Sequence, residues 1–190
     1  MFDSDLIDAL SRTPWWTVPL LWLPGSVGFF LYGVQVHELS LASALAVAAL
    51  GWFAWTLAEY GLHRTVFHWQ PDTRWGPCMH FILHGVHHHW FRDPYRLVMP
   101  PSASLLLCVL FGSAFYALIG PIWFWPYFGG FVFGYLVYDV THYALHHLKM
   151  KNALFLKLKK HHLLHHHSDR HADRKFGVST TLWDHVFQTF

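Results

Sequence analysis

Four apolar stretches set the strongest constraint on how this chain can fold. Each is close to the roughly 20 residues that an α-helix needs to cross a bilayer. They are residues 15–36, 41–58, 103–119 and 121–138. The sequence HELS separates the first two and the dipeptide GP separates the last two, which predicts two helical hairpins. Because 54% of the 190 residues are hydrophobic and only 13% are charged, we expect an all-α integral membrane protein with four transmembrane helices.

The remaining residues, 59–102 and 139–190, are expected to form a helical cap on one side of the membrane. All thirteen Lys and Arg residues lie outside the two outer turns, on the side of both termini. By the positive-inside rule this side is cytoplasmic. Before the first apolar run the acidic residues outnumber the basic ones, which is the wrong charge for a cleavable secretory signal. The acidic residues are Asp3, Asp5 and Asp8, and the basic residue is Arg12. The prediction is one membrane-embedded domain over residues 1–190, with both termini and the cap in the cytoplasm.

The chain holds eighteen histidines, and their spacing is the main sign of chemistry. The densest run, KKHHLLHHHSDRH, is not a purification tag, because leucines interrupt it and the apolar sequence FGVSTTLWDHVFQTF follows it. Four histidine groups recur, in EYGLHRTVFH, LHGVHH, DVTHYALHH and HLLHH. With only two cysteines, Cys78 and Cys108, a disulfide framework, a cysteine zinc site and an iron–sulfur cluster are excluded. A metal in this protein must be held by nitrogen and oxygen.

The spacing within the four groups favours two metal ions. Residues at i, i+3 and i+4 share a face of an α-helix, so three of the groups can direct imidazoles to one point or to two close points. His63 and His68 are about 140° apart around an α-helix, so we expect them to serve different metals or the helix to end between them. Ten imidazoles are too many for one zinc ion and suit two metals with about five ligands each. The ten are His63, His68, His84, His87, His88, His142, His146, His162, His165 and His166.

Several neighbours of the predicted ligands leave alternatives open. Five histidines lie beside a predicted ligand or one helical turn from it, so any of them could take the place of that ligand. They are His80, His89, His147, His161 and His167. His80 is also a candidate to orient ligands without binding a metal. Three carboxylates are candidates to accept the second N–H of a ligand imidazole, namely Glu59, Asp139 and Asp184. Solvated charges at helix ends are the plain alternative, although Asp139 follows a membrane span, where an unpaired charge is costly. Ordinary structural roles are expected for His37, His171 and His185.

The segment RDPYRLVMPP, residues 92–101, connects the second histidine group to the third apolar stretch. Its two prolines break a helix, and the apolar residues before them can lie at the bilayer surface and guide an acyl chain. Arg96, with Tyr95 beside it, is a candidate to contact the head group of a lipid substrate. A simple connector with a general interfacial anchor explains the segment equally well.

The motifs together resemble the membrane fatty acid hydroxylase superfamily, which also contains sterol desaturases, and within it most closely the fatty acid 2-hydroxylases. The resemblance covers about Trp52–Phe190 and rests on EYGLHRTVFH, MHFILHGVHHH, YRLVMPP, GYLVYDVTHYALHH, KKHHLLHHH and FGVSTTLWDHVFQTF, in this order. It implies a di-iron enzyme that uses O2 and two electrons to hydroxylate the carbon next to a fatty acyl carbonyl. It also implies that the ten histidines named above are the iron ligands.

The same resemblance shapes the expected partners. Relatives in fungi and animals often carry an amino-terminal haem domain similar to cytochrome b5, and this chain has no room for one before its first apolar run. We therefore expect a separate electron-transfer protein of cytochrome b5, ferredoxin or reductase type, and a bacterial inner membrane rather than the endoplasmic reticulum. Neutral imidazoles also bind zinc well, so a purified sample can hold zinc in place of iron. Lipid and membrane are expected partners, and nucleic acid is not.

Two other classes of function stay open. One is a related enzyme with a different activity, such as a sterol or carotenoid hydroxylase or a lipid desaturase. The other is a metal transporter or a metal-storage protein without enzymatic activity. Transport is disfavoured because the apolar stretches contain almost none of the ionisable residues that a transport path places within the bilayer.

Overall fold

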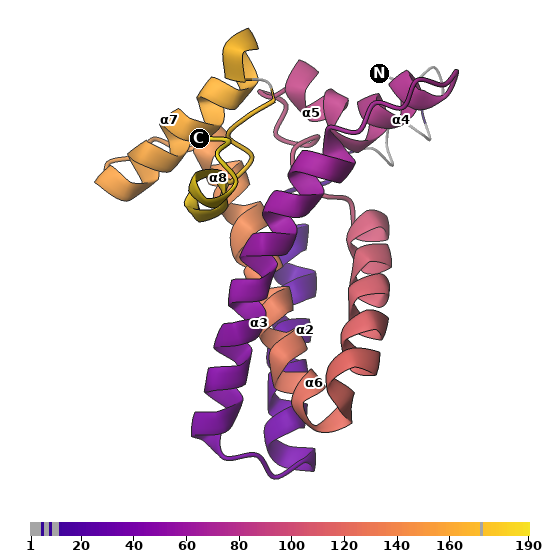
Figure 1. The fold of residues 1–190 in the computed structure, drawn as a ribbon, viewed down its shortest axis with the longest axis vertical. Helices are drawn as coiled ribbons and strands as arrows, with labels where there is room; N and C mark the ends of the chain where they lie inside the picture. The colour runs from indigo at the N-terminus through magenta and orange to yellow at the C-terminus, as the bar shows by residue number, and fades with distance from the viewer. Residues whose placement is uncertain (1–4, 6–7, 9–11, 172) are drawn as a thin grey trace. The chain divides into compact units, whose positions relative to one another are not determined.

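The computed structural model describes residues 12–171 and 173–190, together with Asp5 and Asp8. Asp3, one of the charges that argued against a secretory signal, lies outside the described residues. No β-strand occurs in the described part of the chain, so the all-α prediction is confirmed (Figure 1). The elements are α2 (Thr17–Val36), α3 (Leu41–Leu62), the π-helix η1 (His63–Phe67), α4 (Gly76–His80), the π-helix η2 (Phe81–Gly85), α5 (Val86–His89), α6 (Pro101–His147), α7 (Ala153–His167), the 3₁₀-helix η3 (Asp169–His171) and α8 (Leu182–Val186).

Within the described residues, three helical stretches are long and apolar enough to cross a membrane, judged by length and composition. They are Thr17–Val36, Leu41–Phe67 and Pro101–His147. The third contains both apolar stretches that the sequence predicted as the second hairpin. Large apolar side chains cover the outward surfaces of these helices, as at Leu20, which is 67% exposed, and Leu118, which is 78% exposed. Water disfavours apolar surface of this extent, so the helices indicate a membrane protein.

α6 consists of two helical arms rather than one continuous helix. Gly120 has φ 74° and ψ 168°, which is not helical, and Pro121 follows it directly. Glycine adopts a positive φ without steric cost, and proline fits the first turn of a new helix because its missing N–H is not needed there. The two arms therefore run in opposite directions (Figure 1), as the GP dipeptide predicted.

The chain divides into two compact units. The first comprises Met1–Trp55 and Val98–Val140, and the second comprises Thr56–Leu97 and Thr141–Phe190. The first contains most of the apolar helical sequence, and the second contains the four histidine groups. The limits of the second unit lie within a few residues of the cap that the sequence suggested.

Within the first unit, α3 and the second arm of α6 pack with their backbones in contact. A Cβ atom on Gly130 would lie 1.9 Å from the carbonyl oxygen of Ala48, so only glycine fits there. Beside it, the hydroxyl of Ser26 donates a buried hydrogen bond to Gly129 O at 2.8 Å. Small residues and short polar contacts of this kind hold apolar helices together where the hydrophobic effect does not act.

We expect Gly130→Val to lower the free energy of unfolding by about 1–3 kcal/mol, because the added side chain overpacks this helix contact. Gly28→Val is the matched control, since a Cβ at Gly28 meets nothing within 4 Å, and we expect it to stay within about 0.5 kcal/mol of the parent. Thermal unfolding of both variants in detergent measures the difference. Equal effects at the two positions would contradict close packing at Gly130.

Asp139 is a buried carboxylate of the first unit, 1% exposed. It accepts hydrogen bonds from the backbone N–H of Met99 at 3.1 Å and from the hydroxyl of Tyr135 at 2.9 Å. The sequence suggested that Asp139 orients a ligand imidazole. The structure instead gives it partners that join the segment before α6 to the second arm of that helix.

Candidate metal centre

Ten histidine side chains of the second unit gather into two groups of five. Within each group, one ring nitrogen from every member lies within 4.8 Å of the others. Group 1 is His63, His68, His84, His88 and His165, and group 2 is His87, His142, His146, His162 and His166. These are the ten residues that the sequence predicted as ligands, and both groups can hold a metal ion.

The π-helix η1 explains why His63 and His68 lie in one group. The sequence left two outcomes for this pair, different metals or a helix that ends between them. α3 ends at Leu62, and the chain continues as η1, in which the N–H of His68 bonds the carbonyl of His63 at 3.3 Å. A π-turn closes over five residues, so residues five apart come to share a face. Both imidazoles therefore belong to group 1, which contradicts the first outcome. η1 ends at Phe67, between the two residues, which agrees with the second outcome.

Two other helical regions supply imidazoles to both groups. η2 and α5 together place His84 and His88 in group 1 and His87 in group 2. α7 shows the reverse arrangement. His162 and His166, at i and i+4, belong to group 2, and His165 between them belongs to group 1. The groups are neighbours, since the ring centroids of His88 and His166 are 4.2 Å apart. Because the same helices supply ligands to both groups, the position of one group relative to the other is fixed.

The ring nitrogens converge more closely than hydrogen bonding alone can explain. In group 2, His162 Nε2 lies 2.9, 2.8 and 3.0 Å from the Nε2 atoms of three other members. They are His142, His146 and His166. A neutral imidazole nitrogen carries either one proton or one lone pair, so it cannot satisfy three such neighbours. A cation satisfies all of them by accepting their lone pairs. The donor set therefore fits a bound metal.

Burial keeps these imidazoles in the form that binds a metal. Burial, followed by the charge of neighbouring imidazoles, lowers the pKa of His84, His87 and His162 well below the ordinary range for histidine. The same two causes lower the pKa of His68 and of His88 to about 3. At neutral pH these side chains are uncharged, and protons do not compete with a metal for their lone pairs.

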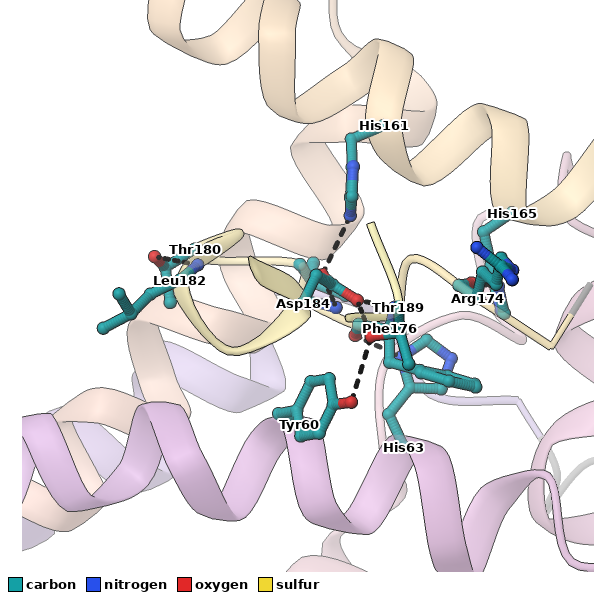
Figure 2. Close-up of polar contacts among 12 residues, drawn as sticks. Tyr60, His63, His161, His165, Arg174, Phe176, Thr180, Leu182, Asp184 and Thr189 are labelled. Atoms are coloured by element: carbon teal, nitrogen blue, oxygen red, sulfur yellow. Dashed lines mark hydrogen bonds and ion pairs between the residues drawn. The ribbon is translucent and has the colours of Figure 1, made fainter. Parts of the chain in front are cut away.

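Backbone carbonyl groups orient two members of group 1. His63 Nδ1 donates to Phe176 O at 2.6 Å, and His165 Nδ1 donates to Arg174 O at 2.7 Å (Figure 2). A proton held on Nδ1 leaves the lone pair on Nε2, which faces the group. Sequence analysis missed these acceptors, because a backbone carbonyl carries no residue-specific signal.

Asp184 supports this backbone rather than a ligand imidazole. Its carboxylate accepts the N–H groups of Phe176 and Gly177, both at 2.9 Å. It also accepts from the hydroxyl of Thr189 at 2.8 Å and pairs with His161 Nε2 at 2.9 Å (Figure 2). Burial acts to raise the pKa of the Asp184 carboxyl, but these donors outweigh burial and bring that pKa below its ordinary value. His161, which the sequence placed beside the ligands, belongs to this network and to neither histidine group.

Glu59 has a similar role on α3. Its Oε1 accepts the backbone N–H groups of Val178 at 2.7 Å and Ser179 at 2.8 Å, and its Oε2 accepts from the hydroxyl of Ser179. The sequence-based idea that Glu59 and Asp184 accept directly from ligand imidazoles is therefore corrected. Both hold the backbone segment whose carbonyl groups accept from the ligands.

The remaining predicted residues lie at the margin of the centre. The ring of His80 is 6.2 Å from that of His68, beside group 1 but outside it. Arg96 forms an ion pair with Asp93. Tyr95 is half exposed, and its backbone N–H also bonds Asp93, at 2.9 Å. Contact of Tyr95 and Arg96 with a lipid head group stays a prediction.

The model of the fatty acid hydroxylase family matches residues 48–189. The chain belongs to this family. The match covers all ten grouped histidines, and it confirms the resemblance inferred from the motifs. Hydroxylases, after which the family is named, are enzymes of the oxidoreductase class.

Named relatives support the assignment. The chain is 41% identical to the ceramide very long chain fatty acid hydroxylase SCS7 of Saccharomyces cerevisiae, over 98% of this chain and 48% of that protein. It is 40% identical to a dihydroceramide fatty acyl 2-hydroxylase of Arabidopsis thaliana, over 99% of this chain and 78% of that protein. It is 34% identical to the fatty acid 2-hydroxylase of Homo sapiens, over all of this chain and 56% of that protein. The chain thus spans about half the length of the yeast and human relatives.

A solved structure gives the same result. The visible hydroxylase domain of full-length scs7p superposes with a TM-score of 0.92 at 40% identity, over 100% of this chain and 71% of that chain. The relatives named here come from a yeast, a plant and a mammal. They do not favour the bacterial inner membrane that the sequence suggested.

Proposed function

We propose that this protein is a membrane-bound oxygenase that hydroxylates a fatty acyl chain at the carbon next to the carbonyl. The observation that carries the proposal is the pair of converging five-histidine groups in a chain of the fatty acid hydroxylase family. The reaction consumes O2, two electrons and two protons, and it yields one hydroxyl group and one water. The names of the relatives, which include ceramide and dihydroceramide acyl 2-hydroxylases, support an acyl lipid as the substrate.

The ten histidines would hold two metal ions, five imidazoles to each. Bound iron would supply the redox chemistry that lets O2 attack an unactivated C–H bond, which redox-inert zinc cannot do. The protein contributes by orienting the ligands. His63 and His165 keep their Nδ1 protons on backbone carbonyl groups, so both direct Nε2 toward group 1. Burial of the groups also excludes bulk water from the reacting atoms.

The proposal includes four membrane crossings, by α2, α3 and the two arms of α6, with both termini and the histidine groups on the cytoplasmic side. The distribution of Lys and Arg supports this orientation. The reversal of α6 at Gly120 supports the second hairpin. Electrons would come from a separate protein of cytochrome b5, ferredoxin or reductase type, and Tyr95 and Arg96 would contact the lipid head group.

The expected depth of the metals in the bilayer favours hydroxylation at the carbon next to the carbonyl. In the sequence, His63 and His142 follow apolar stretches by only a few residues, so the metals would lie near the head-group boundary. A lipid presents its first acyl carbons at that boundary, while mid-chain carbons lie about 10 Å deeper in a hydrocarbon core about 30 Å thick. Hydroxylation near the carbonyl therefore needs no withdrawal of the acyl tail from the bilayer.

An isotope experiment tests this proposal. Cells that express the protein receive a fatty acid deuterated only at the carbon next to the carbonyl, and their lipids are examined by mass spectrometry. The hydroxylated product is expected to lose one deuterium, because the C–H bond that breaks is at that carbon. A fatty acid deuterated only at mid-chain is the matched control and should keep its whole label. Full retention at the first carbon, or a new double bond at mid-chain, would favour the desaturase alternative.

A further inference from the structure

Two buried carboxylates accept four consecutive backbone N–H groups. Asp184 accepts the first two of residues 176–179, both at 2.9 Å, and Glu59 accepts the last two, at 2.7 and 2.8 Å. Asp184 is 0% exposed and Glu59 is 2% exposed. Moving a buried carboxylate away from its donors is costly. The carboxylates therefore hold residues 176–179 in one register, and the N–H of Lys175 bonds Thr189 O at 2.8 Å, next to the hydroxyl that Asp184 accepts. We name residues 174–179 the clamped segment.

The carbonyl groups of the clamped segment orient two of the five members of group 1. Arg174 O and Phe176 O accept the Nδ1 protons of His165 and His63. Group 2 differs, because four of its members have a buried Nδ1 with no hydrogen-bond partner within the described ranges. These are His87, His146, His162 and His166. The clamped segment thus orients members of group 1, and the Nδ1 atoms of these four members of group 2 have no such acceptor in the described part of the chain.

Glu59 and His63 lie one helical turn apart, in α3 and at the start of η1. Glu59 therefore bonds the clamped segment to the same stretch of chain that carries His63, whose Nδ1–H donates to Phe176 O. Asp184 holds the other end of the segment at the N–H of Phe176 itself. The two carboxylates together fix the position of this acceptor from both sides.

We infer that Asp184 and Glu59 are positioning residues that strengthen metal binding at group 1 selectively, through the carbonyl groups of the clamped segment. The inference rests on the two-metal centre of the proposed function. Loss of a partner that orients a metal-bound histidine lowers metal affinity by about 10–100-fold. Among the residues that the structure describes, no hydrogen bond joins this segment to the Nδ1 atoms of the four group 2 members named above, so the affinity of group 2 should stay nearly unchanged.

The experiment measures zinc binding to the purified full chain in detergent, by competition with a chromophoric chelator. Zinc is redox-inert, so the readout does not depend on catalysis. His146→Ala leaves four imidazoles in group 2 and weakens zinc binding there, so the tighter of the two binding steps reports group 1. His68→Ala weakens group 1 in the same way, so the tighter step reports group 2. Asp184→Asn and Glu59→Ala are each added to both backgrounds.

Each carboxylate variant is expected to weaken zinc binding by about 10–100-fold in the His146→Ala background and to leave the His68→Ala background nearly unchanged. Glu59→Gln is the conservative control, because its amide oxygen can still accept the N–H groups of Val178 and Ser179, and it should restore binding. A purely structural role of Glu59 or Asp184 would lower binding in both backgrounds alike. If one variant fails to fold, the other carries the same comparison.

Equal losses in the two backgrounds, or no loss in either, would overturn the inference and leave the metal centre intact. In that case His146→Ala and His68→Ala would still each lower the zinc content of the parent chain. A parent chain that binds no zinc at all would overturn the two-metal centre and this inference with it.

Discussion

Replacing His162 with alanine is expected to remove the metal of group 2 and to abolish hydroxylation. His162 is fully buried, and its Nε2 lies within 3.0 Å of three other ring nitrogens of its group. Its loss leaves that group without its central donor. The metal content should fall from about two to about one per chain. Activity should fall by more than the 10–100-fold that follows loss of a residue that merely supports a ligand.

Metal analysis by mass spectrometry and quantification of the hydroxylated lipid measure the two effects on one preparation. His167→Ala is the matched control, since His167 lies on the same helix, is exposed and belongs to neither group. It should retain both metals and normal activity. A His162→Ala protein with two metals and normal turnover would mean that the second group is not a ligand set.

Eight of the ten grouped histidines could be predicted from the sequence by helical spacing, which is a local property; His63 and His68, five residues apart, do not have that spacing. His142 and His146 share a face at i, i+4 whatever the rest of the chain does. The hairpin at Gly120 was equally predictable, since glycine followed by proline ends one helix and begins another. Such features depend on a few adjacent residues, which the sequence displays directly.

The division of these histidines between two groups could not be predicted in the same way. The π-helix η1 changes the register between His63 and His68, and no residue type in HRTVF specifies a π-turn. The acceptors for Nδ1 of His63 and His165 are backbone carbonyl groups 113 and 9 residues away in the chain, so no local spacing marks them. The sequence marked Glu59 and Asp184 as candidates for a supporting role, but only the tertiary fold specifies that they act through residues 176–179.

Exchange of the bound metal should produce the other large effect. Zinc binds an all-imidazole site at least as well as ferrous iron, in line with the usual order of affinities. We expect the zinc-loaded protein to hold about two metals per chain and to give no detectable product, because zinc cannot change oxidation state. The same protein, stripped and reloaded with ferrous iron without oxygen, should hydroxylate acyl lipid once O2 and a reductant are added.

The comparison is made on one preparation divided into two portions, with metal content, thermal unfolding and product measured on each. Equal stoichiometry and equal unfolding temperature would establish that the two portions differ only in redox chemistry, because the ligands are neutral imidazoles that hold either divalent ion. The loss of product in the zinc portion would then be assigned to electron transfer and not to a damaged fold. A zinc-loaded protein that forms hydroxylated lipid as fast as the iron-loaded one would contradict an oxygenase mechanism, since O2 cannot be reduced at such a site without a metal that donates electrons.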